Sequence, residues 1–262
     1  MNIRDSVPGR GAAPDRVPAA SVAAGVAAVI AAAGQGKRMG GGTPKQFLPL
    51  KGKPVLAWTL LAFQKASEIR SIVLVCPEGD EDYCQREIVR PYGLDKVHRI
   101  LPGGQERQES VYRGLRAVDS GCGLVAIHDG ARPLVTAAII SRTVAEARRH
   151  GAAVVAVPVK DTVKIAGASE MISETPDRRT LWAAQTPQVF FRELALSAHR
   201  RALEEGFLGT DDSALVERLG HPVKLVIGEP ENLKITAPLD LLVAEAILEK
   251  RLGPGAATDG AR

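Results

Sequence analysis

A glycine-rich loop near the N-terminus is the strongest candidate for chemistry in this sequence. Residues 31–47, AAAGQGKRMGGGTPKQF, place Lys37, Arg38 and Lys45 among closely spaced glycines. Glycine lets the backbone turn sharply and bring its N–H groups against a ligand, and a concave run of N–H groups binds anions. Because the three cations add positive charge to the same loop, these residues suit a nucleoside triphosphate.

A flexible turn whose cations face water is the plainer interpretation of the same residues. We favour a ligand site because the loop directly follows an apolar run, 26–32, that predicts a buried strand. Open α/β sheets bind ligands beyond the carboxyl ends of their parallel strands.

Two familiar phosphate-binding motifs fail on spacing. A P-loop needs Lys-Ser/Thr after its last glycine, where this chain has Gly42 and Thr43 after Gly41. A dinucleotide fingerprint needs a third glycine at the position of Met39, and the next glycine, Gly40, comes one residue late. A nicotinamide-dependent dehydrogenase is therefore disfavoured.

Short apolar runs alternate with longer stretches of helical periodicity along most of the chain. They predict strands at 26–32, 71–75, 97–101, 124–128, 152–157 and 224–227, and helices at 55–65, 80–92, 107–118, 136–150, 191–205, 212–219 and 238–252. The continuous apolarity of the strands indicates burial on both faces, as in a mostly parallel sheet. We therefore expect an α/β, Rossmann-like fold in which helices cover both faces of that sheet.

The pattern changes between residues 158 and 189. Extended-looking pieces at 162–165 and 171–175 are joined by turns that contain Gly and Ser. We expect an extended β-arm over 158–186 that leaves the main domain. A lone hairpin is marginally stable in water, so the arm should pack against something, most simply the same arm of a second subunit. The sequence thus favours a homodimer.

Composition limits the partners and the compartment. The 34 Lys and Arg residues exceed the 30 Asp and Glu residues by only four, and 4% of the residues are aromatic. Charge and aromatic content therefore do not support a groove that binds nucleic acid. No apolar run is long enough, with enough large side chains, to cross a membrane. We therefore expect neither a nucleic acid nor a membrane as a partner. The three cysteines, Cys76, Cys84 and Cys122, have no metal or redox spacing, which favours the reducing cytoplasm.

The two ends of the chain differ in composition from the rest. We expect residues 1–24 to be a disordered extension, because Asp5, Asp15 and Pro18 interrupt what would otherwise resemble a secretory signal. Residues 25–252 should form a single domain. We expect 253–262 to be a disordered tail that is too short for another domain, and hence a single activity in the chain.

Six more motifs follow the glycine-rich loop in order. They are Gly103-Gly104-x-x-Arg107-x-x-Ser110-Val, His128-Asp129-Gly130-Ala-Arg132-Pro, Lys160-Asp161-Thr162-Val-Lys164, Asp177-Arg178 through Leu181-Trp182 to Thr186-Pro-Gln, Thr210-Asp211-Asp212, and Asn232-Leu-Lys234-Ile-Thr236. Each alone is a weak signal. Together with A-A-G-x-G-x-R-M and P-K-Q of the loop, they resemble the cytidylyltransferases of isoprenoid precursor synthesis, specifically those that act on 2-C-methyl-D-erythritol 4-phosphate. The resemblance spans about residues 26–252 and implies a fold of the nucleotidyltransferase type.

This resemblance implies a reaction. CMP would pass from CTP to 2-C-methyl-D-erythritol 4-phosphate, giving 4-diphosphocytidyl-2-C-methyl-D-erythritol and pyrophosphate in the non-mevalonate pathway. Such a transfer brings several negative charges together, so cations should surround the reacting phosphates. By the resemblance, Arg38 and Lys45 stabilise the transition state, and Arg178 and Lys234 position the polyol phosphate.

The same resemblance implies binding residues. Nucleotide-binding residues would be Ala32, Ala33, Gly34, Gly36, Gly104, Ser110, Asp129 and Gly130. Residues that bind the polyol phosphate would be Arg132, Asp161, Thr162, Arg178, Thr186, Thr210 and Lys234. Asp129 would also help to hold Mg²⁺, an ion that combines few carboxylates with substrate phosphates. The arm residues would contribute to the active site of the partner subunit.

Alternatives remain open at this point. Asp129 could be an ordinary turn or cap aspartate at a strand end, and neither Arg178 nor Lys234 would be singled out without the resemblance. A ribitol 5-phosphate cytidylyltransferase shares the loop and the H-D-x-A-R-P segment. A non-catalytic nucleotide-binding protein is the alternative from another class. We expect His128 to make a structural hydrogen bond, because a phosphate nucleophile needs no general base.

Overall fold

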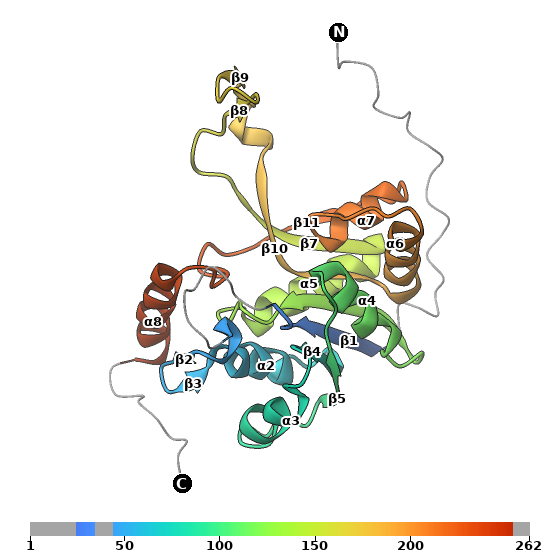
Figure 1. Cartoon of the computed structure of the whole chain (residues 1–262), viewed down its shortest axis with the longest axis vertical. Coiled ribbons are helices and arrows are strands. Elements are labelled where there is room, and N and C mark those ends of the chain that lie inside the picture. The colour runs from blue at the N-terminus through green and yellow to red at the C-terminus, as the bar shows by residue number, and fades with distance from the viewer. Residues whose placement is uncertain (1–24, 35–43, 254–262) are drawn as a thin grey trace.

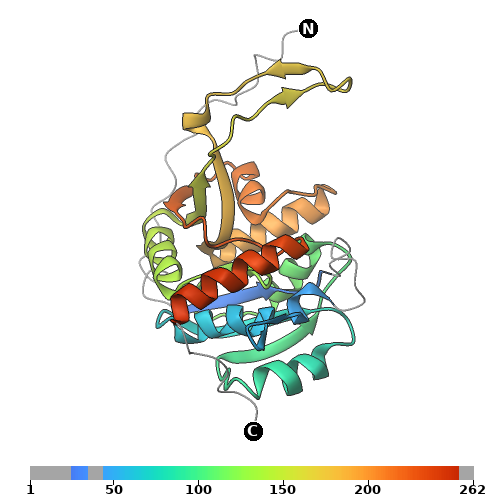
Figure 2. The same cartoon turned by 90° about the vertical axis from the view of Figure 1, so that its left-hand side faces the viewer.

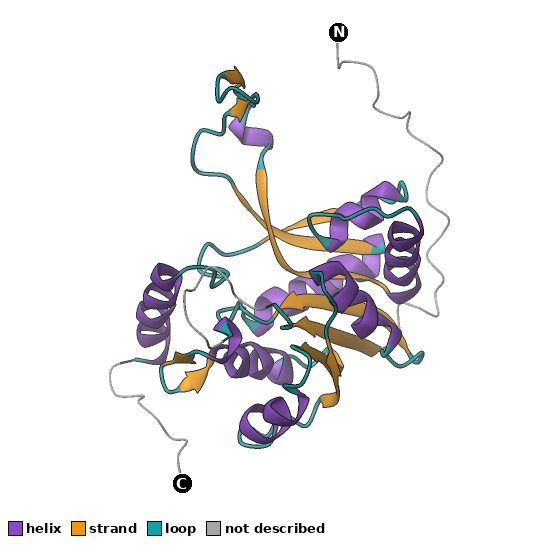
Figure 3. Ribbon diagram, viewed as in Figure 1, coloured by secondary structure: helices purple, strands orange, loops and turns teal. Residues whose placement is uncertain are grey.

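A seven-stranded sheet forms the centre of the molecule, in the order β11-β7-β10-β6-β1-β4-β5 (Figures 1 and 3). The structure is a computed structural model that describes residues 25–34 and 44–253. The strands of this sheet are β1 (Gly25–Ala31), β4 (Ile69–Cys76), β5 (Val97–Pro102), β6 (Cys122–Asp129), β7 (Ala152–Pro158), β10 (Trp182–Phe191) and β11 (Lys224–Ile227). Neighbouring strands are parallel except where β10 pairs with β6 and β7. All six predicted strands are present, and the mostly parallel α/β sheet is confirmed.

Helices cover both faces of the sheet because alternate strand residues point to opposite sides. On β1, Val26, Ala28 and Ile30 pack in one core cluster, and Ala27 and Val29 pack in another. The first cluster includes side chains of α2 (Val55–Lys65) and α5 (Ala137–His150). The second includes side chains of α4 (Arg107–Arg116), α6 (Arg192–Glu204) and α7 (Asp212–Arg218).

A third, smaller core cluster fixes the segments that flank the glycine-rich loop and Lys234. It joins Leu50, Leu134, Ile235 and Leu248. These residues connect β2 (Pro49–Leu50), which pairs with β3 (Lys53–Pro54), to α8 (Pro238–Leu252). The helix α8 lies across the molecule in Figure 2. The segment after the loop, which begins with the short helix η2 (Lys45–Phe47), is thereby held near the segment that precedes α8.

An arm projects from the sheet in both views (Figures 1 and 2). It carries the short hairpin of β8 (Ile165–Ala166) and β9 (Ile172–Glu174), followed by η4 (Arg178–Thr180). Pairing of β7 with β10 continues to Pro158 and Trp182, so the projecting part is 159–181. Our sequence interpretation missed β10, which places 182–191 in the middle of the sheet. The strand's polar Gln-Thr-Pro-Gln stretch resembles a turn in sequence.

Most predicted helices agree with the structure to within two residues at either end. The region 80–92 differs, because it divides into a three-residue helix α3 (Glu81–Tyr83) and a π-helical turn η3 (Cys84–Val89). Cys76, Cys84 and Cys122 are buried and free. In the described ranges, no helix combines the length and apolarity that crossing a bilayer requires. The predictions for 1–24 and 254–262 concern residues outside these ranges.

Candidate active site

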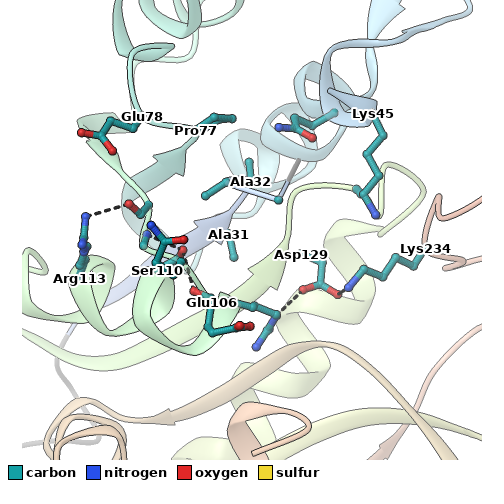
Figure 4. Close-up of a pocket in the computed structure, with 18 residues that line it drawn as sticks. Ala31, Ala32, Lys45, Pro77, Glu78, Glu106, Ser110, Arg113, Asp129 and Lys234 are labelled. Atoms are coloured by element: carbon teal, nitrogen blue, oxygen red, sulfur yellow. Dashed lines mark hydrogen bonds and ion pairs between the residues drawn. The ribbon is translucent and has the colours of Figure 1, made fainter. Parts of the chain in front are cut away.

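Two adjoining pockets open where parallel strands of the sheet end. The larger, of about 720 Å³, is lined by Ala31 at the end of β1, Pro77 after β4, Gly103 after β5 and Asp129 at the end of β6, together with Lys45 (Figure 4). The smaller, of about 260 Å³, lies toward β10. Arg107, Asp129 and Lys234 line both pockets, so the two spaces meet at these side chains.

Asp129 is an ionised carboxylate surrounded by cations. Arg107 Nε donates to its Oδ1 at 2.9 Å, Lys234 Nζ donates to its Oδ2 at 2.9 Å, and Arg132 Nε lies 3.6 Å from Oδ2. Burial raises the pKa of Asp129, but the charges of Arg107, Lys234 and Arg132 outweigh burial and hold that pKa well below its usual range. The side chain is only 9% exposed. This site therefore carries fixed charges of both signs at the junction of the pockets.

Tertiary contacts bring Lys234 to Asp129 from the loop between β11 and α8. Asn232 is fully buried, and its Nδ2 donates to the carbonyl oxygen of Thr186 at 2.9 Å. The Ile235 N–H donates to the carbonyl oxygen of Ala131 at 2.8 Å. These two bonds, one on each side of Lys234, hold the lysine's backbone against the strand ends and direct its side chain to the carboxylate (Figure 4).

The floor of the larger pocket requires small residues. A Cβ added at Gly103 would lie 2.1 Å from Ala33 Cβ and 2.9 Å from Ser110 Oγ. The Gly104 N–H donates to Ser110 Oγ at 3.0 Å, and that hydroxyl donates to the Glu106 carbonyl oxygen at 3.0 Å. The backbone at Gly103 thus packs directly against the Ala33 methyl group and the Ser110 hydroxyl, and Ser110 fixes the shape of the 103–106 loop.

A hydrogen-bonded chain supports Asp129 from behind. The Asp129 N–H donates to Thr186 Oγ1 at 3.1 Å. The same hydroxyl donates to His128 Nδ1, 2.9 Å away, because the other ring nitrogen, Nε2, faces a carbonyl oxygen and therefore carries the imidazole proton. His128 Nε2 then donates to the Arg132 carbonyl oxygen at 3.3 Å. Burial lowers the pKa of His128 to about 3, and the imidazole is therefore neutral near pH 7. This geometry fits the structural role expected for His128.

Most of the site residues implied by the resemblance come together here. Those in the larger pocket are Ala32, Ala33, Gly34, Lys45, Gly104, Ser110, Asp129 and Lys234, and those in the smaller pocket are Arg132, Thr186 and Thr210 with Asp129 and Lys234. Gly130 lines neither pocket: its N–H donates to the Ala31 carbonyl oxygen at 2.8 Å, and its own carbonyl oxygen accepts from Thr59 Oγ1 at 2.9 Å. Direct contact of Gly130 with a nucleotide is therefore not supported. Gly36 and Arg38 lie outside the described residues.

The arm residues do not reach either pocket of their own chain. Asp161 and Thr162 are exposed and line neither pocket. Arg178 is also exposed, and its Nη1 donates to the Lys160 carbonyl oxygen at 2.7 Å. Within one described chain, the polyol-phosphate residues implied by the resemblance are therefore divided between the pockets and the arm.

Sequence reasoning gave no role to Arg107, although it lies in a quoted motif. Its Nη2 donates to Asp212 Oδ2 at 2.9 Å while its Nε bonds Asp129. Burial lowers the pKa of Arg107, but the attraction of Asp212 and Asp129 more than offsets this effect and raises the pKa above its ordinary value. Asp212 is 2% exposed, and His199 Nε2 lies 3.2 Å from its Oδ1. No local sequence signal joins Arg107 to Asp212, because they come from separate helices.

Asp129 fits Mg²⁺ only if the substrates supply most of the ligands. Within 25–34 and 44–253, there is no cluster of three or more His, Cys, Asp or Glu side chains that could hold a metal ion. A carboxylate has about four acceptor positions, and the bonds from Arg107 and Lys234 use two of them at Asp129. Mg²⁺ in phosphoryl-transfer sites commonly takes one or two carboxylates plus phosphate oxygens. The donor set is thus compatible with a magnesium–nucleotide complex.

Comparison with known proteins identifies the family. Residues 26–250 match the family model described as 2-C-methyl-D-erythritol 4-phosphate cytidylyltransferase. A protein of that name from Caldanaerobacter subterraneus subsp. tengcongensis is 52% identical over 225 residues, which cover 86% of this chain and 99% of that protein. Another, from Desulforamulus reducens, is 51% identical over 226 residues, 86% of this chain and 97% of that protein.

Solved structures agree with these matches. The crystal structure of 4-diphosphocytidyl-2C-methyl-D-erythritol synthase from Anaerococcus prevotii has a TM-score of 0.77 at 34% identity, covering 86% of this chain and 99% of that one. That of 2-C-methyl-D-erythritol 4-phosphate cytidylyltransferase from Thermus thermophilus has a TM-score of 0.70 at 38% identity, covering 85% and 98%. Sequence, sheet topology and these likenesses agree, and the chain belongs to the 2-C-methyl-D-erythritol 4-phosphate cytidylyltransferase family.

Proposed function

We propose that this chain transfers CMP from CTP to 2-C-methyl-D-erythritol 4-phosphate, giving 4-diphosphocytidyl-2-C-methyl-D-erythritol and pyrophosphate. Family membership supports the reaction. The observation that carries it at the site is Asp129, held by Arg107 and Lys234 where a larger and a smaller pocket meet. CTP would occupy the larger pocket and the polyol phosphate the smaller one, so their phosphates would meet at the junction.

The chemistry needs charge and alignment more than proton transfer. A phosphate oxygen of the polyol attacks the α-phosphorus of CTP, a new P–O bond forms, and the bond to the β-phosphate oxygen breaks. Pyrophosphate leaves with that electron pair. The nucleophile is already an anion, so no side chain has to remove a proton. Fixed cations that stabilise the charge on the non-bridging and leaving oxygens are what the reaction requires.

We assign roles to the cations on that basis. Lys45, in the larger pocket, would bind the triphosphate together with Arg38 and stabilise the charge that develops on the leaving pyrophosphate. Lys234 contacts Asp129 at the junction and would position the attacking phosphate. Asp129 with the nucleotide's phosphate oxygens would hold Mg²⁺, which neutralises phosphate charge when bound.

The arm would complete the site of a second subunit. Its exposed apolar side chains, Val163, Ile165, Met171 and Ile172, support burial in a homodimer. Pairing of arms would carry Asp161, Thr162 and Arg178 toward the smaller pocket of the partner. A cytoplasmic location is proposed with the rest, supported by three buried, free cysteines.

A coupled assay for pyrophosphate tests the proposed function. The protein is mixed with CTP and Mg²⁺, and with either 2-C-methyl-D-erythritol 4-phosphate or ribitol 5-phosphate. We expect pyrophosphate release with the first acceptor at a rate well above that with the second. Exclusive use of ribitol phosphate would overturn the assigned acceptor. Tight CTP binding without pyrophosphate from either acceptor would favour a non-catalytic nucleotide-binding protein.

A further inference from the structure

A line of alternating charges, half-buried at Lys234 and Arg107 and buried at Asp129 and Asp212, runs from the pockets into the body of the protein. Lys234 contacts Asp129, Asp129 contacts Arg107, and Arg107 contacts Asp212, each through a nitrogen–oxygen distance of 2.9 Å. The first three side chains line both pockets, whereas Asp212 lines neither. Asp212 therefore contacts the shared lining of the pockets through Arg107, and its chain neighbour Asp211 lines the smaller pocket.

Arg107 joins three elements that are far apart in sequence. It is the first residue of α4, Asp129 ends β6, and Asp212 is the first residue of α7. Its Nε and Nη2 donate to two different carboxylates, which fixes the plane of the guanidinium. Without the bond to Asp212, Arg107 would keep only one of these two anchors.

A buried carboxylate at the start of a helix, as at Asp212, is energetically unfavourable for packing alone. The Asp212 side chain is 2% exposed, and a buried ion pair is often no more stabilising than apolar residues of similar volume. Its immediate neighbour Asp211 already caps α7, because the Asp211 carboxylate accepts from the Ala214 N–H at 2.9 Å. A requirement for a second, buried carboxylate at this point is explained if its partner Arg107 must be held in one position.

We infer that Asp212 is a positioning residue, which anchors Arg107 and thereby fixes the Asp129 carboxylate at the junction of the two pockets. This inference rests on the proposed function, because Asp129 is taken to act where the two substrates meet. Removing a residue that orients a side chain of a site through a hydrogen bond commonly lowers activity by about 10–100-fold.

The charge balance gives the inference a distinctive signature. Around the junction, Arg107, Arg132 and Lys234 face the carboxylates Asp129 and Asp212, and the buried His199 also contacts Asp212. Removing Asp212 makes the cluster more positive, which does not weaken and can strengthen the binding of an anion such as CTP. Turnover should nevertheless fall, because Arg107 and Asp129 lose their fixed geometry. Damage that is merely structural would weaken both binding and turnover.

The experiment compares Asp212→Ala, Asp212→Asn, Arg107→Gln and the double variant Asp212→Ala/Arg107→Gln. The control is Leu215→Ala, which removes a core side chain of α7 without changing charge. We expect Asp212→Ala to lower kcat by about 10–100-fold while the Kd for CTP, measured by calorimetry, stays the same or decreases. Asp212→Asn should recover part of the kcat, because its amide oxygen can still accept from Arg107 Nη2. In the Arg107→Gln background, Asp212→Ala should cause no further loss.

Three results would overturn the inference. One is a double variant whose kcat falls by the product of the losses in the two single variants, which would mean that the two residues act independently. Another is a loss of both CTP affinity and kcat in Asp212→Ala that is no different from the loss in Leu215→Ala, when the two variants are equally destabilised against heat. If Asp212→Ala does not fold, a kcat for Asp212→Asn equal to that of the wild type also overturns it. Failure of the proposed function is distinguishable, since the wild type would then release no pyrophosphate from CTP. In that case, weaker CTP binding by Asp212→Ala than by Leu215→Ala would still overturn the inference.

Discussion

Lys234 Nζ lies 2.9 Å from Asp129 Oδ2, although the two residues belong to opposite halves of the chain. Asp129 ends a central strand, and Lys234 lies in the loop before the last helix. Because the two side chains line both pockets, the contact places a cation at the point where an acceptor phosphate would approach CTP.

Lys234→Ala should therefore impair the reaction through the acceptor phosphate. We expect kcat/KM for the polyol phosphate to fall by about 10²–10³-fold, the range found when one preorganised electrostatic contact is removed, with a smaller effect on the Kd for CTP. Steady-state kinetics with each substrate varied in turn measures the two effects. Lys224→Ala, which removes an exposed lysine of β11, is the control and should leave kcat/KM unchanged. Equal kinetics for the two variants would contradict the role of Lys234.

Close packing at Gly103 predicts a contrast with Gly34. Gly103→Ala would place a Cβ 2.1 Å from Ala33 Cβ, whereas a Cβ at Gly34 meets no atom of the described residues within 4 Å. We expect Gly103→Ala to lower the free energy of unfolding by about 1–3 kcal/mol through overpacking, and Gly34→Ala to leave it unchanged. Chemical denaturation measures both values. If Gly34→Ala nevertheless weakens CTP binding in calorimetry, a close approach of the nucleotide to that backbone gains support. If Gly103→Ala has the stability of the wild type, the segments that carry Gly103 and Ala33 can move apart without cost.

Complementation tests whether the arm acts on the partner subunit. Lys45→Ala and Arg178→Ala should each be nearly inactive alone. In a mixed dimer, one site would combine the intact Lys45 of one chain with the intact Arg178 of the other, so co-expression of the two variants should restore pyrophosphate release. A mixture that stays as inactive as its components, with dimers present, would place Arg178 in the site of its own chain. An Arg178→Ala variant that is fully active alone would place Arg178 outside any site.

The apolar arm surface predicts the oligomeric state. Ile172 is 63% exposed in β9, and Ile172→Asp would introduce a charge into the proposed interface. We expect this variant to shift the sedimentation coefficient from that of a dimer toward that of a monomer. Leu203 of α6 is similarly exposed at 64%, so Leu203→Asp is a matched control that should sediment as the wild type does. A dimer that tolerates Ile172→Asp but not Leu203→Asp would move the interface from the arm to α6.

Asp240 gives a prediction for the pH dependence of stability. Its Oδ2 accepts from the Thr236 N–H at 2.8 Å, from Thr236 Oγ1 at 2.7 Å and from the Ala237 N–H at 2.8 Å, which closes the start of α8. Burial raises the pKa of Asp240, but the hydrogen bonds from Thr236 and Ala237 dominate and lower that pKa overall. A carboxylate with a lowered pKa stabilises the folded state above the unfolded pKa, about 3.9 for Asp, and this stabilisation is lost as the pH falls.

Asp240→Asn should accordingly reduce the free energy of unfolding by about 1 kcal/mol near pH 7, as loss of a helix cap does. The difference from the wild type should narrow as the pH falls below about 4. Urea denaturation at a series of pH values measures this difference. Asp95→Asn, at an exposed position, is the control, and its stability should follow the wild type throughout. A difference that widens in acid would mean that the Asp240 carboxylate does not stabilise the folded state.

Much of the fold could be predicted from local sequence. The helices 55–65 and 238–252 match α2 and α8 residue for residue, since their apolar spacing and flanking prolines are local signals. The apolar runs located six strands for the same reason. β10 was missed, because Gln185 to Gln188 resemble a turn and only the two neighbouring strands, β6 and β7, make this segment a central strand. The split of 80–92 into α3 and η3 had no local signal that we recognised.

The sequence by itself determined which residue types could do chemistry: a cationic glycine-rich loop, an aspartate at the end of a buried strand, and ordered motifs that resemble one family. Tertiary structure decided which of them meet. It joined Asp129 to Lys234 and Arg107, connected Arg107 to a buried Asp212, and carried Arg178 away on an exposed arm. The physical reason is that periodicity and turn preference act over a few residues, whereas the pairing of buried charges depends on which distant elements the sheet and its packed helices bring together.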